Sequence, residues 1–276
     1  MKQIESAPSN IEWLRWGKVD PFYGVASWEG RQRGGPNPWT AEDFYSLGHS
    51  DWADFRRHWV NYGVDLGQVV EIGCGAGRLT KSMAADFAQV VGVDVSDDIL
   101  EVARSHIPEP NVQLRVGDGV RLPVETASVD GAFSTHVFQH FDSLALARAN
   151  FSEVARILKP GGTMMVHLPV VMPPAGLPGI LLALAAKRKL GDLRAMLRRR
   201  RGAPLMRGLQ YPWQWLVQEL PDLGLVDVEL VVLATKSNGD YHACILAWRS
   251  DSAPGGFAER YAFNVVASGS RRSFTR

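Results

Sequence analysis

The chain has 276 residues, of which 46% are hydrophobic and 21% charged, and its formal net charge is +1 at pH 7. The length suits one large α/β domain with additions, and the composition is ordinary for a soluble globular protein. Because the overall charge is close to zero, no global positive field attracts nucleic acid, and the composition disfavours a dedicated RNA or DNA enzyme.

The chain has two cysteines, Cys74 and Cys244, which lie far apart in the sequence. They offer neither a disulfide framework nor a thiolate cluster for a metal, so we expect a reducing, cytoplasmic location. The first 20 residues are polar, and we expect no secretory signal. The apolar run at 175–186 is shorter than the ~20 residues that span a bilayer, so we expect no transmembrane helix.

Residues 1–64 precede the first predicted strand and are rich in tryptophan, phenylalanine and tyrosine. Between Pro38 and Tyr62, apolar residues recur at near-helical spacing, and Gly48 with Ser50 marks a break between two short helices. We interpret 1–64 as an N-terminal aromatic, helical cap that covers one edge of a sheet.

Residues 65–168 alternate strand and helix patterns, which predicts a parallel sheet with helices on both faces. Ser96 and Asp142 are placed to cap two of the helices. The fold class we expect is α/β, a Rossmann-like doubly wound sheet that is mostly parallel. The predicted strands are 68–73, 89–94, 112–116, 129–135 and 162–168, and the predicted helices are 78–87, 97–106 and 142–158.

A glycine-rich loop follows the first predicted strand, in the order Glu71-Ile72-Gly73-Cys74-Gly75-Ala76-Gly77. Glycine is needed where a chain turns sharply off a strand with positive φ and a ligand lies against its backbone. Asp94 ends the next strand, roughly 20 residues after the first glycine, where a carboxylate can accept both hydrogen bonds of a ribose diol. The alternative for Asp94 is a helix-capping or surface role. The spacing favours an adenosine-containing ligand.

The loop reads G-x-G-x-G and has Arg78 where a dinucleotide-binding loop has its third glycine, which disfavours NAD. With Val93-Asp94-Val95-Ser96 it resembles the class I S-adenosylmethionine-dependent methyltransferases. Three further stretches match that family in order. They are Val116-Gly117-Asp118-Gly119, Val129-Asp130-Gly131-Ala132-Phe133-Ser134 and Leu158-Lys159-Pro160-Gly161-Gly162-Thr163.

The resemblance implies S-adenosylmethionine as cofactor, S-adenosylhomocysteine as product, and a set of contacting residues. It places Asp118 and Gly119 beside the adenine, while a simple turn aspartate is the alternative for Asp118. We expect Glu71 to support the site and Cys74 to fill space in the turn. The candidate cofactor-binding residues are Tyr23, Glu71, Gly73, Cys74, Gly75, Gly77, Arg78, Asp94, Val95, Asp118, Gly119 and Thr135.

Arg78 opens the first core helix, where a cation gains nothing from the helix dipole. Its partner is then a carboxylate in the cap or that of the cofactor, and plain surface exposure is the alternative. Tyr23 lies in a turn-rich stretch of the cap that could close over the methionine end of the cofactor.

His136 and His140 follow the fourth strand, where the resembled family lines the space between cofactor and acceptor. Four residues apart, they could share a helix face and hold a metal, but no other ligand cluster accompanies them, and we expect no metal. Either could instead be a general base, because imidazole titrates near neutral pH. Packing alone is the alternative, and methyl transfer to a nucleophilic acceptor needs no base.

Residues 169–210 read as a helical lid insertion, with eight Lys or Arg and one Asp between 187 and 201. This basic stretch could steer an anionic acceptor, touch a membrane face or be a solvated lid. Residues 211–249 complete the core with a helix and an antiparallel strand pair joined at Asn238-Gly239-Asp240. We expect 250–276 to be a flexible tail that folds back only in part.

The resemblance thus predicts a methyltransferase that acts on O, N or C of a small-molecule acceptor. Ser134-Thr135-His136-Val137 does not match the N-P-P-Y type of tetrad of nucleic-acid amine methylases, which favours a metabolite. The alternatives are an RNA or protein methyltransferase that uses the basic stretch, and a protein that binds S-adenosylmethionine for non-methylating chemistry. The oligomeric state is not predicted.

Overall fold

The computed structural model describes residues 8–171, 208–235, 241–250 and 265–267. Its centre is a nine-stranded sheet with the strand order β3-β2-β1-β4-β5-β8-β7-β9, and β6 pairs with β5 beside this path. The strands are β1 (Gln68–Ile72), β2 (Gln89–Asp94), β3 (Val112–Val116), β4 (Val129–Ser134), β5 (Leu158–Val171), β6 (Tyr211–Pro212), β7 (Leu225–Thr235), β8 (Tyr241–Arg249) and β9 (Val265–Ala267).

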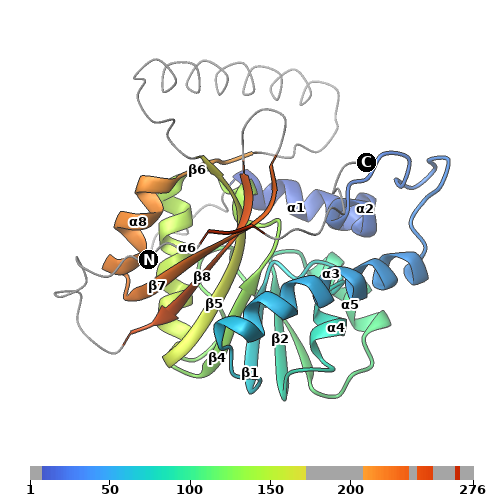
Figure 1. Ribbon diagram of the computed structural model, residues 1–276. Coiled ribbons are helices and arrows are strands. Elements are labelled where there is room, and N and C mark those ends of the chain that lie inside the picture. The colour runs from blue at the N-terminus through green and yellow to red at the C-terminus, as the bar shows by residue number, and fades with distance from the viewer. Residues whose placement is uncertain (1–7, 172–207, 236–240, 251–264, 268–276) are drawn as a thin grey trace, which may run out of the picture.

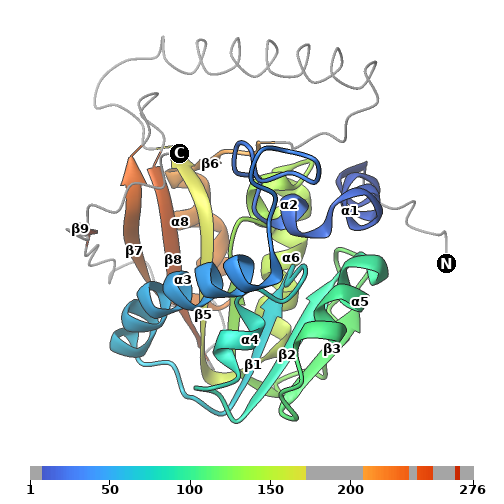
Figure 2. The same ribbon diagram turned by 90° about the vertical axis from the view of Figure 1, so that its right-hand side faces the viewer.

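Helices cover both faces of this sheet (Figures 1 and 2). α3, α4 and α5 lie on one face and α6 and α8 on the other, while α1 and α2 lie beyond the strand ends. The helices are α1 (Pro8–Val19), α2 (Pro21–Val25), α3 (Ala41–Tyr62), α4 (Thr80–Met83), α5 (Asp97–His106), the 3₁₀ turn η1 (Phe138–His140), α6 (Leu144–Ile157) and α8 (Trp213–Asp222).

The first half of the sheet is parallel, as the strand–helix alternation predicts. β1 pairs with both β2 and β4, so the chain order reverses beside β1. A sheet of this kind binds ligands at the carboxyl ends of its strands near such a reversal. Val69, Val70, Val90 and Val129 are fully buried, because helices cover both faces of these strands.

The C-terminal strands confirm the predicted antiparallel pair. β8 pairs antiparallel with both β5 and β7. β9, from the segment we expected to be a tail, adds a parallel strand at the edge of β7. The predicted turn at 238–240, most of the predicted lid (172–207), and the tail apart from Ser250 and 265–267 lie outside the described residues.

α3 differs from the predicted pair of short helices, because it runs without a break from Ala41 to Tyr62. Gly48 lies inside it, where a Cβ atom would stand 2.1 Å from the backbone oxygen of Arg78. This glycine therefore allows a close approach of two backbones and does not end a helix. α3 also lies across a face of the sheet and not along an edge, since Trp59 packs against Gly131 in β4.

Some element boundaries also differ from the sequence-based expectation. Asp142 does not cap α6, because the Ser143 hydroxyl accepts the hydrogen bond from the Leu146 backbone N–H at 3.2 Å. Ser96 caps α5 as predicted and accepts from the Ile99 N–H at 3.4 Å. α4 is one turn long instead of ten residues, and β5 extends from Leu158 to Val171, beyond both predicted ends.

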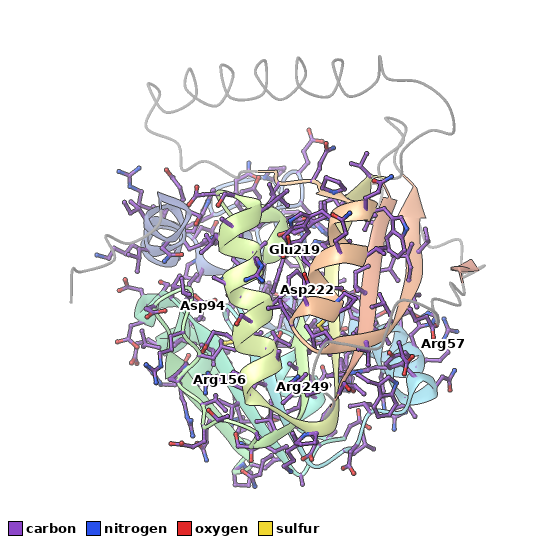
Figure 3. All side chains as sticks on the ribbon, turned by 90° about the vertical axis from the view of Figure 1, so that its left-hand side faces the viewer. Arg57, Asp94, Arg156, Glu219, Asp222 and Arg249 are labelled. Carbon is purple, nitrogen blue, oxygen red and sulfur yellow. The ribbon has the colours of Figure 1, made fainter. Side chains whose placement is uncertain are left out.

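α6 and α8 pack side by side on the face opposite α3 (Figure 3). Arg148 on α6 and Glu219 on α8 form an ion pair with a 2.5 Å N–O distance. Arg156, near the end of α6, donates to the backbone oxygens of Leu122 and Val124 at 3.0 and 2.9 Å. These contacts hold the segment between β3 and β4 against α6. None of the helices in the described ranges is both long and apolar enough to cross a membrane.

Candidate functional site

The glycine loop leaves β1 and turns beneath the end of β2. The N–H groups of Gly73 and Cys74 both donate to the Val93 backbone oxygen, at 2.7 and 3.0 Å. Gly73, Gly75 and Gly77 have φ of 71°, 56° and 76°, in the left-handed region that favours glycine. The predicted turn is therefore confirmed.

Crowding adds a second reason for glycine in this loop. A Cβ atom at position 73 would lie 2.2 Å from Val137, and one at position 75 would lie 2.5 Å from Val25 of α2. The loop is thereby held between the cap and the segment that follows β4.

Asp94 ends β2 with its carboxylate turned toward the glycine loop. One oxygen accepts from the Gly75 N–H at 2.9 Å and the other from the Ser96 N–H at 3.0 Å. Burial raises the pKa of Asp94 above its ordinary value, while these amide hydrogen bonds act in the opposite direction. The carboxylate is thus held in one orientation at the edge of a cavity.

This cavity encloses about 850 Å³, part of it open to solvent, at the carboxyl ends of β1, β2, β3 and β4. The predicted residues that line it are Gly73, Gly75, Asp94, Val95, Gly119, Thr135, His136 and His140. The fold therefore brings both predicted groups together, the cofactor-binding loop and the histidines after β4.

The segment after β4 forms the wall opposite the glycine loop. His136 has φ +58°, which is unusual for a residue with a side chain, and its backbone N–H donates to His167 Nδ1 at 3.3 Å. His140 packs edge-on against Trp13, with ring centroids 5.1 Å apart. The Thr135 hydroxyl is buried at the cavity and has no hydrogen-bond partner among the residues that the structure describes.

α1 supplies cavity residues that the sequence did not single out. Ser9, Asn10 and Trp13 all line the cavity, and the buried Ser9 hydroxyl has no partner within the described protein. Asn10 donates to the Asp118 backbone oxygen at 3.0 Å. Asn150 of α6 also lines the cavity and donates to the Gly119 backbone oxygen at 3.1 Å. These residues lie far from the glycine loop in sequence, and no local motif marks them.

Six predicted cofactor-binding residues do not line this cavity, and they are Tyr23, Glu71, Cys74, Gly77, Arg78 and Asp118. Arg78 instead forms a buried ion pair with Asp51 of α3, the cap carboxylate that was one of its two predicted partners. Glu71 is buried below the loop and accepts from the Thr80 hydroxyl. Burial raises the pKa of Glu71 to about 7.

Asp118 adopts the turn role that was the alternative to adenine binding. Its Oδ1 atom accepts from the backbone N–H groups of Val120 and Arg121, at 2.8 and 2.7 Å. Tyr23 packs against Trp16, with ring centroids 5.6 Å apart, while Val25 from the same helix borders the cavity.

Cys74 and Gly77 serve the structure of the loop itself. Cys74 is buried, and burial raises the pKa of its thiol well above the ordinary value, which fits the predicted filler role. A Cβ at Gly77 would stand 2.2 Å from Ile107, so this glycine lets α5 pack closely.

α3 holds the glycine loop from outside the cavity. The Tyr45 hydroxyl donates to the Ala76 backbone oxygen at 2.8 Å, and His49 lies within hydrogen-bond distance of Ser82, at 2.9 Å. With the Arg78–Asp51 pair, these contacts make the N-terminal helices a support for the loop.

The described part of the chain holds no cluster of three or more metal-ligating side chains.

The strand order, the glycine loop and the aspartate after β2 together define a nucleoside-binding α/β domain. Comparison with known proteins gives its family. Residues 70–166 match the family model described as a methyltransferase domain. Over these residues the chain is similar to the class I S-adenosylmethionine-dependent methyltransferases.

Two curated relatives show the extent of the similarity. A ubiquinone biosynthesis O-methyltransferase of Xanthomonas oryzae pv. oryzae is 37% identical over 117 residues, which are 40% of this chain and 47% of that protein. The O-methyltransferase cnsE of Penicillium expansum is 31% identical over 103 residues, 36% of each chain. The chain thus spans about half or less of the length of these relatives.

Solved structures share the fold over more of the chain. Geranyl diphosphate C-methyltransferase from Streptomyces coelicolor A3(2) aligns with a TM-score of 0.59 at 17% identity, over 88% of this chain and 98% of that one. YcgJ from Bacillus subtilis aligns with a TM-score of 0.51 at 16% identity, over 74% of this chain and 100% of that one. At such identities the likeness concerns the fold alone.

The residues present fit the cofactor that the family implies, S-adenosylmethionine. Gly73 and Gly75 keep the cavity floor free of Cβ atoms, and Asp94 has acceptor capacity beyond its two amide bonds. The Ser9 and Thr135 hydroxyls, which have no partner in the described ranges, add donors and acceptors for a polar ligand. Apolar side chains complete the wall, namely Val95, Ile99, Val120 and Leu122.

Proposed function

We propose that this protein transfers a methyl group from S-adenosylmethionine to an oxygen, nitrogen or carbon atom of a small-molecule acceptor. The observation that carries the proposal is that one cavity is bordered by the glycine loop and Asp94 on one side and by His136, His140 and Trp13 on the other. Two small molecules held in a shared space can be aligned for direct transfer, and alignment supplies much of the acceleration of such reactions.

The cofactor side of the cavity would be formed by the ends of the first three strands. Asp94 would accept hydrogen bonds from the ribose hydroxyls, and the backbone of Gly73 and Gly75 would lie against the methionine part. Val95 and Ile99 would pack on the adenine. When bound, S-adenosylmethionine supplies a methyl group on a positively charged sulfur, a good leaving group for in-line displacement.

The opposite side would bind the acceptor. Trp13 and Phe141 offer aromatic surface, and His136 and His140 offer imidazole nitrogens. If the acceptor is a hydroxyl group, a neutral imidazole can take its proton as the oxygen forms the new bond to carbon. Both His136 and His140 are candidates for this role, and His140 Nε2 lies 3.0 Å from the Gln139 side-chain nitrogen.

An oxygen atom of an apolar small molecule is the acceptor type that we test first. The support comes from the two relatives described as O-methyltransferases and from the aromatic side chains of the cavity. The predicted RNA or protein alternative depends on the basic stretch at 187–201, which lies outside the described residues.

The test is incubation with methyl-deuterated S-adenosylmethionine in an extract of the source cells, followed by separation into small-molecule, RNA and protein fractions. We expect the labelled mass in a small molecule for the wild type and its loss for Asp94→Ala. Label only in RNA or protein would overturn the acceptor class. If the wild type also fails to bind S-adenosylhomocysteine in a calorimetric titration, the methyltransferase proposal itself is wrong.

A further inference from the structure

Three histidines from separate parts of the chain form a row that starts at the cavity wall. His136 follows β4, His167 lies in β5 and His242 lies in β8. The His136 and His167 ring centroids are 4.3 Å apart, and the His167 and His242 rings are stacked at 5.2 Å. His167 is 2% exposed, so the middle of the row is buried within the sheet.

The sheet register explains why the last two rings meet. His167 is directly opposite Cys244 in the antiparallel pair of β5 and β8, and His242 is two residues from Cys244 on the same face. His167 and His242 are therefore diagonal neighbours, a distance that aromatic rings can bridge. Hydrogen-bond distances of 3.3 and 3.2 Å link the three residues into a row.

The backbone N–H of His136 determines which ring nitrogens of His167 and His242 carry protons. The His136 N–H donates to His167 Nδ1 at 3.3 Å, so Nδ1 carries no proton and the proton of the neutral ring is on Nε2. His167 Nε2 lies 3.2 Å from His242 Nδ1. His167 then donates to His242, whose own proton must be on its Nε2 atom.

The same hydrogen bond also explains the left-handed backbone conformation of His136. A residue with a side chain at φ +58° persists only where its surroundings hold it in place. Here the buried His167 receives the amide hydrogen bond and contacts the ring, which directs the His136 residue to the cavity.

We propose that His167 and His242 are positioning residues for methyl transfer, which hold His136 at the cavity wall through the chain His136 N–H to His167 Nδ1 and His167 Nε2–H to His242 Nδ1. The catalytic part of this proposal rests on the proposed function. The geometric part does not, and it can be tested without an acceptor.

The geometric test is nitrogen NMR of the full chain labelled at histidine. We expect both His167 and His242 to be neutral with the proton on Nε2. We also expect the amide–α coupling and the carbon shifts of His136 to report a left-handed residue. A proton on His167 Nδ1 would overturn the proposal.

Two substitutions of the middle residue separate the hydrogen bond from simple packing. His167→Asn keeps an acceptor oxygen near the place of Nδ1, whereas His167→Leu fills the space without one. The left-handed signature of His136 should persist in the asparagine variant and be lost in the leucine variant. Equal behaviour of two folded variants would mean that the hydrogen bond does not position His136.

The catalytic test uses the acceptor found by labelling. His167→Leu should lower kcat by about 100-fold, the effect of a displaced reacting group, with recovery in His167→Asn. His242→Phe keeps a stacked ring without an acceptor and should lower kcat less. The S-adenosylhomocysteine Kd should stay within about twofold throughout, as expected for a loss confined to the reaction step. An unchanged kcat in His167→Leu would overturn the positioning role.

The two proposals fail in different ways. A wild-type protein that binds no S-adenosylhomocysteine would remove the proposed function, while the histidine tautomers and the His136 backbone could still be as inferred. Conversely, normal methyl transfer in His167→Leu would leave the proposed function intact and remove the positioning role of the histidine chain.

Discussion

The carboxylate of Asp94 accepts a hydrogen bond from the backbone N–H of Gly75 at 2.9 Å, which joins the end of β2 to the loop that follows β1. Its other oxygen accepts from Ser96 at 3.0 Å. Both oxygens are therefore oriented by the fold itself, and a carboxylate with about four acceptor sites keeps capacity for a ligand donor. The residue that would bind the ribose is also a structural part of the loop that would face the methionine.

Asp94→Ala should weaken S-adenosylhomocysteine binding by roughly two to four orders of magnitude, because two charge-assisted hydrogen bonds at about 1.5–3 kcal/mol each are lost. Asp94→Asn, which keeps one acceptor oxygen, should fall between this variant and the wild type. Calorimetric titration measures both. Asp97→Ala, which removes an exposed carboxylate nearby, is the control and should bind normally. Unchanged affinity in Asp94→Ala would refute the ribose assignment.

Gly75→Ala should lower cofactor affinity at least tenfold and also destabilise the fold, since it combines strain at φ +56° with a Cβ only 2.5 Å from Val25. Gly161→Ala is the matched control, because position 161 has φ +76° but nothing within 4 Å of the added Cβ. It should show only the left-handed strain, about 1–2 kcal/mol, with normal affinity. Denaturant unfolding and titration of both variants separate the two effects. Equal results at the two positions would mean that crowding against α2 has no role.

Most helices and strands could be predicted from the sequence, because the residues that mark them lie within the element itself or beside it. Continuous apolar strands, such as the one ending at Asp94, and capping residues such as Ser96 mark their elements without tertiary context. Gly48 was misread for the same reason. A glycine inside a helix signals a break from sequence alone, whereas its cause here is the backbone of Arg78, thirty residues further along the chain.

The sequence predicted only those residues of the candidate site that directly follow a strand. The glycine loop, Asp94 and the histidines follow strands directly, and several of them meet in the cavity. Ser9 and Asn10 come from α1, whose position depends on packing against α5 and on contacts such as Asn10 with the Asp118 backbone. Such long-range contacts leave no periodic signal in one sequence.

Glu71 should make stability depend on pH. Its pKa in the folded protein is raised to about 7 from 4.5, because burial disfavours the carboxylate. The contribution of Glu71 to the free energy of unfolding is therefore fully present below its pKa in the unfolded chain, 4.5. It is lost as pH rises through its pKa in the folded protein, about 7. Unfolding free energy should fall by roughly 3 kcal/mol from this group between pH 4.5 and pH 8.

The control is Glu71→Gln, which cannot ionise. Denaturant unfolding at a series of pH values should show a flatter profile for this variant between pH 5 and pH 8, with the difference from wild type growing between the unfolded pKa of 4.5 and the folded pKa of about 7. A wild-type profile that is parallel to that of the glutamine variant would show that Glu71 titrates at its ordinary value.

Gly48→Ala should destabilise the protein, although the same change at an exposed helical position stabilises by about 1 kcal/mol. The new Cβ would stand 2.1 Å from the Arg78 backbone oxygen, so α3 must move away from the loop, at a cost of about 1–3 kcal/mol or more. The exposed Ser50 of the same helix provides the comparison, because Ser50→Ala should be more stable than Ser50→Gly. Opposite signs at the two positions in denaturant unfolding would establish that Gly48 serves the contact between α3 and the loop. The same sign at both would mean that propensity alone governs position 48.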